Sequence, residues 1–320
     1  MVACGTGTPI PTSRGRGCFT IIIENVDYLV FDIGMGAEAT LNSFNNTDQL
    51  SLITNIFITH YHGDHTGGIP GALNLGYLLG RKNSSQAIAI HGADNELLYN
   101  LTQGMRHFYA MDTINRQLLV DFPRNICTPT FNTPTNPQLD PTIFDSLNFV
   151  STPFDPPPLD NKTQVIVYQN KKHNLTVKAF RVYHYTANPA VGYNIQYKNI
   201  KISISGDTVG YPTTRAILNA AKNADYLIHE VMNGTYIHKV VQSHSSAFDK
   251  FYSECQVYDA HTTIPQLATL AKLANVKNLI LTHIVPSPLT KEDETRLKDA
   301  IAETYKGKIY IAADYDYWLV

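Results

Sequence analysis

Hydrophobic positions along the chain fall into two successive blocks, each of which starts with strands and continues with alternating helices and strands. Runs of β-branched and aromatic residues predict the strands, and apolar residues at helical spacing predict the helices. Two such blocks favour two sheets packed face to face with helices outside. We therefore expect an α/β fold, a four-layer αββα sandwich, in one domain that spans residues 1–320. The predicted strands cover 19–24, 28–32, 56–59, 87–90, 165–169, 175–184, 191–197, 201–205, 226–230, 278–284 and 308–312, and the predicted helices cover 72–79, 95–111, 213–221, 264–274 and 291–305.

One stretch breaks this regular pattern. Nine of the 17 prolines lie between Pro123 and Pro158, and proline is excluded from helix interiors and central strands. We therefore expect an insertion in the domain at about residues 123–160. It is either a long surface excursion or a lid at the rim of a site.

The charge balance limits the partners that the chain can attract. It has 25 basic and 27 acidic residues, a formal net charge of −2, and only 16% charged residues. No strong overall field draws it to nucleic acid or to an anionic membrane, although a local basic patch stays possible. No apolar run approaches the roughly 20 residues of a membrane-spanning helix, so we expect no membrane partner.

The cysteines do not define a disulfide framework. Four cysteines in 320 residues are too few for a disulfide scaffold. They form no Cys-x-x-Cys pair, which argues against a thiolate zinc site. Zero, one or two disulfides are all compatible with the sequence.

The segment that carries the chemistry is Thr59-His60-Tyr61-His62-Gly63-Asp64-His65, which directly follows a predicted strand. Histidine is the commonest metal ligand, and aspartate adds an anionic oxygen. His60 and His62 are two positions apart, so they face the same way at the end of an extended strand. Gly63 permits a sharp turn before Asp64 and His65. The segment can therefore divide its ligands between two adjacent metal ions.

This His-x-His-x-Asp-His pattern resembles the signature of the metallo-β-lactamase superfamily, and later motifs match it in order. They are Tyr183-His184-Tyr185, Ser205-Gly206-Asp207-Thr208 and Leu281-Thr282-His283-Ile284. The resemblance implies one metal on His60, His62 and His184, a second on Asp64, His65 and His283, and Asp207 as the bridge between them. Such ligands suit two zinc ions, with manganese or iron as alternatives. Two adjacent cations can activate a bridging water, so we expect a metal-bridging hydroxide as the nucleophile.

Within the superfamily, the chain resembles the ribonuclease Z-like branch, including its arylsulfatase-like members. The matching segments are Gly5-Thr6-Gly7-Thr8-Pro9, Phe31-Asp32-Ile33-Gly34, Asp225-Tyr226-Leu227-Ile228-His229-Glu230 and Ala260-His261-Thr262-Thr263. The resemblance implies that Asp32 orients a ligand histidine. It also implies that His261, supported by Glu230, contacts the substrate phosphate and helps to protonate the leaving group. Together with Asp64, these two residues form the expected catalytic set.

The resemblance implies a metal-dependent hydrolase of ester bonds, and the substrate is predicted from what the chain lacks. Only 23 positions separate His184 from Asp207, where short bacterial ribonuclease Z carries an arm that grips tRNA. Arg14-Gly15-Arg16-Gly17 stands in place of the family's early Arg-Asn signature. We therefore expect a small anionic substrate, a phosphodiester or a sulfate ester, and do not expect tRNA.

Two alternative functions stay open. Lactonases and thioester hydrolases share the histidine-rich loop but attack a carbonyl carbon, whereas the His261 motif suits a phosphorus or sulfur centre. A non-catalytic metal-binding protein of the same fold is the other alternative, and the intact ligand set argues against it. A homodimer is possible. The low charge and the arylsulfatase-like resemblance favour a periplasmic or secreted protein, and a cytoplasmic location stays open.

Overall fold

The computed structural model describes residues 1–10, 12–44, 49–80, 86–121, 148–160 and 162–320, and for 113–121 it describes the backbone alone. The strands are β1 (Val2–Gly5), β2 (Cys18–Ile23), β3 (Asp27–Phe31), β4 (Asn55–Phe57), β5 (Ile88–Ala93), β6 (Phe149–Phe154), β7 (Gln164–Asn170), β8 (Leu175–His184), β9 (Ala187–Tyr197), β10 (Ile200–Ile204), β11 (Tyr226–Met232), β12 (Asn278–Val285) and β13 (Lys308–Ile311). The α-helices are α1 (Ala37–Ser43), α2 (Gly63–Thr66), α3 (Ile69–Leu78), α4 (Asn95–Asp121), α5 (Ala216–Ala220), α6 (Gly234–Ser243), α7 (Ala247–Ser253), α8 (Ile264–Leu273) and α9 (Lys291–Ala302). Short helical turns lie at η2 (Gln49–Leu52), η5 (Lys171–His173) and η6 (Glu254–Tyr258).

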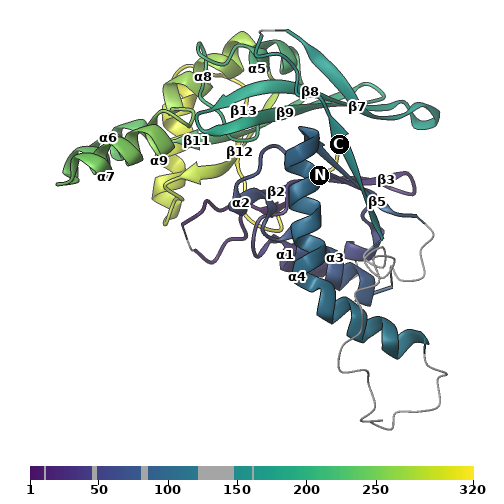
Figure 1. Ribbon diagram of the computed structural model, residues 1–320. Helices are drawn as coiled ribbons and strands as arrows, with labels where there is room; N and C mark the ends of the chain where they lie inside the picture. Colours follow the sequence, from purple (N-terminus) through teal and green to yellow (C-terminus); the bar gives the residue numbers. More distant parts are fainter. Residues whose placement is uncertain (11, 45–48, 81–85, 122–147, 161) are drawn as a thin grey trace.

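The strands in this part of the chain form two mixed sheets (Figure 1). The first has six strands in the order β1-β2-β3-β4-β5-β6, and the second has seven in the order β13-β12-β11-β10-β9-β8-β7. Strands β3 to β6 run parallel in the first sheet, and strands β10 to β13 run parallel in the second. Because parallel strands end at the same edge of a sheet, the residues that follow them gather there.

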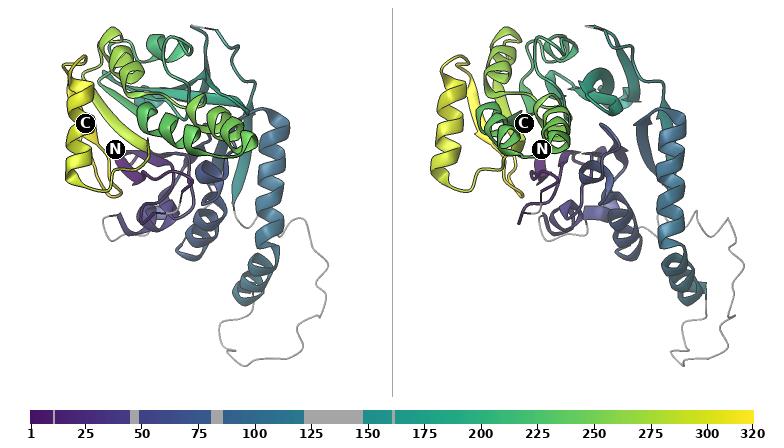
Figure 2. Two further views of the ribbon diagram at one scale, coloured as in Figure 1. Left: turned by 90° about the vertical axis from the view of Figure 1, so that its left-hand side faces the viewer. Right: turned by 60° about the vertical axis from the view of Figure 1, so that its left-hand side comes forward.

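Buried apolar side chains form layers on both sides of each sheet. One cluster lies between the sheets and includes Phe31, Phe57 and Tyr193 in mutual ring contact. A second packs the first sheet against α1, α3 and α4, and a third packs the second sheet against α5, α8 and α9. Figure 2 shows these helices on the outer sides of the molecule. The αββα sandwich that the sequence predicts is therefore confirmed.

The element prediction is incomplete: strand β1 and helices α1 and α2 are not among the predicted elements. Helix α4 runs to Asp121 instead of ending at 111, and helices α6 and α7 between β11 and His261 are not predicted at all. Part of the proline-rich stretch is strand β6, which pairs with β5 at the edge of the first sheet. An edge strand tolerates Pro153 because one side of its backbone needs no partner. The rest of the expected insertion, 122–147, lies outside the described residues, and the one-domain prediction stays a prediction.

One cysteine pair is joined. Cys4 of β1 and Cys18 of β2 form a disulfide, with their Cα atoms 5.0 Å apart. Cys255 is a buried free thiol, and Cys127 lies outside the described residues. The sequence leaves zero, one or two disulfides open, and in the described residues the structure has one, which links the first two strands.

Candidate metal centre

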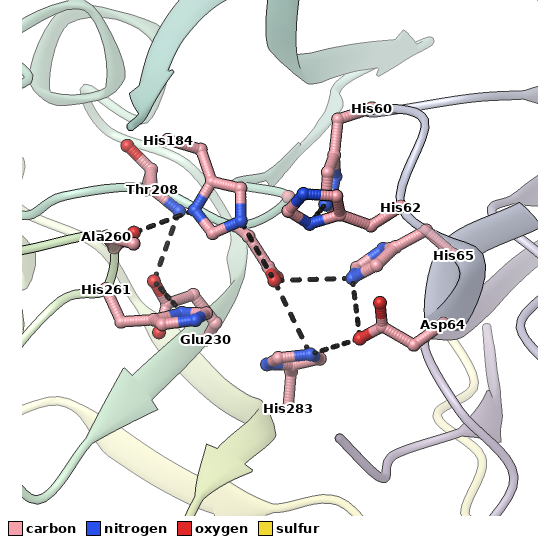
Figure 3. Close-up of polar contacts among 12 residues, drawn as sticks. His60, His62, Asp64, His65, His184, Thr208, Glu230, Ala260, His261 and His283 are labelled. Atoms are coloured by element: carbon pink, nitrogen blue, oxygen red, sulfur yellow. Dashed lines mark hydrogen bonds and ion pairs between the residues drawn. The ribbon is translucent and has the colours of Figure 1, made fainter. Parts of the chain in front are cut away.

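All seven predicted metal ligands come together at one edge of the two facing sheets (Figure 3). They come from four separate segments of the chain, the first of which supplies four of them. His60 and His62 follow β4, Asp64 and His65 lie on α2, His184 ends β8, Asp207 follows β10, and His283 lies near the end of β12. This is the edge at which the parallel strands end, so the fold itself brings the histidines together.

Local backbone irregularities aim two of these side chains. His283 has a positive φ of 44° and lies at a bulge where the register between β11 and β12 shifts after Glu230. A bulge of this kind turns a side chain out of the regular alternation of the strand. Gly206 has a φ of 60°, and a Cβ atom there would lie 2.8 Å from the Cβ of Thr59. Glycine therefore lets the Asp207 loop pack closely against the strand end that carries His60.

The ligand atoms form two adjacent groups. His60, His62 and His184 make one group, and Asp64, His65, Asp207 and His283 make the other, with the ligand atoms of each group within 4.8 Å of one another. In the second group, Asp207 Oδ2 lies 3.3 Å from His65 Nε2 and 3.4 Å from His283 Nε2. The same oxygen lies 3.8 Å from His184 Nε2 in the first group. Asp207 is therefore placed between the two groups.

Hydrogen bonds on the outer side of the rings fix how three histidines face the centre. Asp32 accepts hydrogen bonds from His65 Nδ1 at 2.8 Å and from the Thr59 hydroxyl at 2.7 Å. Because that hydroxyl donates to Asp32, it accepts from His60 Nδ1 at 3.1 Å. His184 Nδ1 donates to the carbonyl of Ala260 at 2.8 Å. In all three rings Nδ1 carries the proton outward, and Nε2 faces the centre as a metal ligand must.

The charges at the centre favour bound cations. Burial alone would raise the pKa of Asp64, but His65 and His283 lower it to about 2. Burial would also raise the pKa of Asp207, but His283 and His65 outweigh it and hold that pKa well below its usual value. The carboxylates in turn overcome burial to raise the pKa of His65 well above its ordinary value. Two buried anionic carboxylates thus stabilise positive charge among them.

The donor set fits a metal site. His65 Nε2 is buried without a hydrogen-bond partner, although it lies 3.6 Å from Asp64 Oδ2 and 3.3 Å from Asp207 Oδ2. Imidazole nitrogen and carboxylate oxygen are the ligands that zinc, manganese and iron accept. A cation between these atoms would satisfy the orphaned nitrogen and balance the carboxylates. The residues present are therefore compatible with metal binding.

Glu230 and His261 lie beside the ligand groups. Glu230 Oε1 accepts hydrogen bonds from the backbone N–H of Thr208 at 3.1 Å and of Thr262 at 3.0 Å. His261 Nδ1 lies 3.2 Å from the same oxygen, without hydrogen-bond geometry. The His261 ring stacks on the ring of His283 at 5.6 Å between centroids. Glu230 thus fixes Thr208 and Thr262, which directly follow Asp207 and His261. It therefore also positions the two loops that carry those side chains.

Sequence reasoning does not find every residue that shapes this site. Thr59 and Thr208 adjoin predicted ligands, so a polar residue next to a ligand is the signal that could have identified them. Ala260 acts through its backbone carbonyl, which leaves no trace in the sequence. Thr262 belongs to the His261 motif, and its hydroxyl donates to the carbonyl of Thr208 at 2.7 Å.

Comparisons with known proteins agree with this geometry. No family model matches the chain. Ribonuclease Z of Methanosarcina acetivorans is 27% identical over 92% of this chain and 90% of its own length. Ribonuclease Z of Listeria monocytogenes is 29% identical over 89% of this chain and 88% of its own length. Among solved structures, the metallo-β-lactamase fold protein YhfI from Bacillus subtilis has a TM-score of 0.62 at 13% identity and covers 99% of this chain and 97% of its own.

The short form of human tRNase Z also matches, with a TM-score of 0.58 at 23% identity over 98% of this chain and 96% of its own. The chain has the metallo-β-lactamase fold and is similar in sequence to ribonuclease Z over most of its length. The resemblance inferred from the histidine motifs is therefore confirmed.

The substrate prediction needs correction. A small anionic ester without tRNA is contradicted by relatives named ribonuclease Z and by the similarity to tRNase Z. The comparisons give no support to an arylsulfatase. The prediction relied on the missing arm and on a net charge of −2, and net charge does not describe local surface charge. In the described part of the chain, no helix combines the length and apolar character needed to cross a membrane.

Proposed function

We propose that this ribonuclease Z-like protein is a binuclear metal-dependent ribonuclease that hydrolyses a phosphodiester bond in RNA of the tRNA type. The observation that supports it is the pair of adjacent ligand groups with Asp207 between them and His261 at their side. Paired metals suit phosphodiester hydrolysis because the attacking and the leaving oxygen both carry charge in the transition state.

His60, His62 and His184 would hold one metal ion, and Asp64, His65 and His283 the other, with Asp207 shared. Zinc is the ion we propose for both positions, since histidine-rich sites with carboxylate ligands suit it. When bound, two such ions would activate water and neutralise charge on the phosphate. The protein's own contribution is to fix the ligand rings through Asp32, Thr59 and the Ala260 carbonyl.

His261 is the residue we propose as the proton donor to the leaving oxygen. Its Nδ1 faces the Glu230 carboxylate at 3.2 Å, so Nε2 is the atom left to serve the substrate. The ring is mostly shielded from water, with 8% of the residue exposed. A shielded donor that is held in place delivers a proton only to a substrate seated in the site.

The test is cleavage by the zinc-loaded protein of a tRNA transcript with a 3′ extension. A lactone and a thioester serve as substrates of the competing enzyme class. We expect cleavage of the RNA that is lost with a chelator and in Asp207→Ala, and no turnover of the carbonyl substrates. An exposed histidine outside the ligand groups, changed in His238→Ala, is the matched control and should keep full activity. Turnover of the lactone or thioester without RNA cleavage would contradict the proposal.

A further inference from the structure

Lysines gather at the end of the second sheet that is farthest from the metal centre. The turn between β7 and β8 carries Lys171 and Lys172, the turn between β9 and β10 carries Lys198, and Lys201 begins the next strand. We call these four residues, together with Lys222, the lysine edge. Figure 1 shows the two turns at the end of the strands away from α2.

Backbone hydrogen bonds hold these lysines close together. The N–H of Asn174 donates to the carbonyl of Lys171 at 3.3 Å, and the N–H of Lys198 donates to the carbonyl of Asn174 at 3.1 Å. On the other side of the turns, Lys201 Nζ donates to the carbonyl of Lys222 at 2.8 Å. The lysine edge is therefore a defined surface.

Carboxylates do not neutralise this surface. Among the residues that the structure describes, no ion pair involves a lysine of the edge. The nearby Asp225 pairs with Lys277 at 2.7 Å and accepts from the backbone of Lys201. Asp27 is buried and accepts from Tyr168 and Asn170. Burial, and after it the charge of the nearby Lys178, lower the pKa of Lys201.

The lysine edge also has a recess that fits an anion with several oxygens. Lys171 and Lys198 line an open depression of about 490 Å³ whose other walls are mostly amide and hydroxyl side chains. They include Gln169, Asn174, Thr176, Gln196 and Asn199. Ammonium groups beside amide and hydroxyl donors are the usual contacts of a nucleic-acid backbone, which is bound mainly through its phosphate oxygens.

From this charge complementarity we infer that the lysine edge binds the phosphate backbone of the RNA substrate, at a second contact remote from the metal centre. The inference rests on the proposed function, because it assumes an RNA long enough to reach both places. Strand β8 has ten residues and runs from the edge to His184, so at about 3.3 Å per residue the two lie roughly 30 Å apart. That is on the order of one turn of a nucleic-acid double helix.

The test compares the wild type with the triple variant Lys171→Gln, Lys172→Gln and Lys198→Gln. The probe is the 3′-extended tRNA transcript, and the readouts are Kd by fluorescence anisotropy at several salt concentrations and the separate values of KM and kcat. Lysines that contact phosphate weaken binding when removed and flatten its salt dependence by about one unit of log–log slope each. We expect Kd and KM to rise about tenfold or more, the slope to fall by two to three, and kcat at saturating RNA to stay unchanged.

A second triple variant, Lys291→Gln, Arg296→Gln and Lys298→Gln on α9, removes the same charge elsewhere and is the matched control. It should bind RNA much as the wild type does. Thermal unfolding and metal content check that both variants fold. If the wild type cleaves the RNA and the two triple variants have equal Kd and slope, the inference is overturned while the proposed function stands. If the zinc-loaded wild type cleaves no RNA, the proposed function fails and the inference with it.

Discussion

Removing the imidazole of His261 is the sharpest test of how the site works. The structure leaves two roles for this ring. Its Nδ1 faces Glu230 at 3.2 Å, which suits a proton donor that acts through Nε2. Its ring nitrogen also groups with the ligand atoms of His184 and Asp207 within 4.8 Å, which suits a third metal-binding position. His261→Ala distinguishes the two roles because only the second predicts a loss of metal.

The expected size of the effect depends on the leaving group. A positioned general acid contributes typically 10²–10⁴-fold in rate, which corresponds to about 3–5 kcal/mol in the transition state. A ribose oxygen needs this proton, so the variant should lose kcat/KM for RNA by that factor. A nitrophenolate leaves without a proton, so hydrolysis of bis-(p-nitrophenyl) phosphate should fall by less than about tenfold.

The assay measures kcat/KM for both substrates together with the zinc content of the purified variant by elemental analysis. His238→Ala again controls for the loss of a histidine, because that side chain is exposed and lies on α6 outside the ligand groups. Equal losses on both substrates would show that His261 does not donate the proton. Loss of zinc would assign it to metal binding instead.

Three further outcomes follow from the geometry. Asp32→Asn should lower metal affinity by about 10- to 100-fold in a zinc titration, because the carboxylate that fixes His65 is lost; unchanged affinity would count against this role. The disulfide closes a loop across a separation of 14 residues, so Cys4→Ser with Cys18→Ser should lower the free energy of unfolding by about 3 kcal/mol in urea, and reductant should then have no added effect. Burial lowers the pKa of His91 to about 4, below the value of the unfolded ring, so its stabilising contribution is complete above pH 6.5 and is lost as the pH falls to 4. Between pH 7 and pH 4, the free energy of unfolding of His91→Phe should therefore fall by about 3 kcal/mol less than that of the wild type. An equal fall for both proteins, measured by urea unfolding at the two pH values, would refute this.

The sequence predicts the first four residues of the candidate metal centre because their chemistry is local, and the family resemblance adds the later ones. His60, His62, Asp64 and His65 lie within six positions, and strand ends place the later ligands at the same edge. The pattern does not reveal contacts between residues far apart in the sequence. One example is the hydrogen bond from His184 to the carbonyl of Ala260, 76 positions away, which orients the histidine ring. Backbone groups leave no compositional signal, so that contact follows from the fold alone. Helices α6 and α7 are missed for another reason. Most of their side chains are exposed. In these two helices only Ile237 and Val241 of α6 are buried, so few core positions mark the stretch as helical.

The contradicted substrate prediction shows how a charge averaged over the whole chain conceals the charge of a local surface. The net charge of −2 argues against RNA binding only if the charge is spread evenly over the surface. The missing arm argues against it only if no other surface contacts the RNA. Screening limits the reach of a surface charge to about 8 Å at physiological salt, so acidic residues on distant helices do not cancel unpaired lysines at the end of the second sheet. The same strands that carry Lys171 and Lys198 at one end carry His184 and Asp207 at or just beyond the other. In our proposal, a rigid sheet with cationic turns sets the distance between the backbone contact of the RNA and the scissile bond, the task that the arm performs in short bacterial ribonuclease Z.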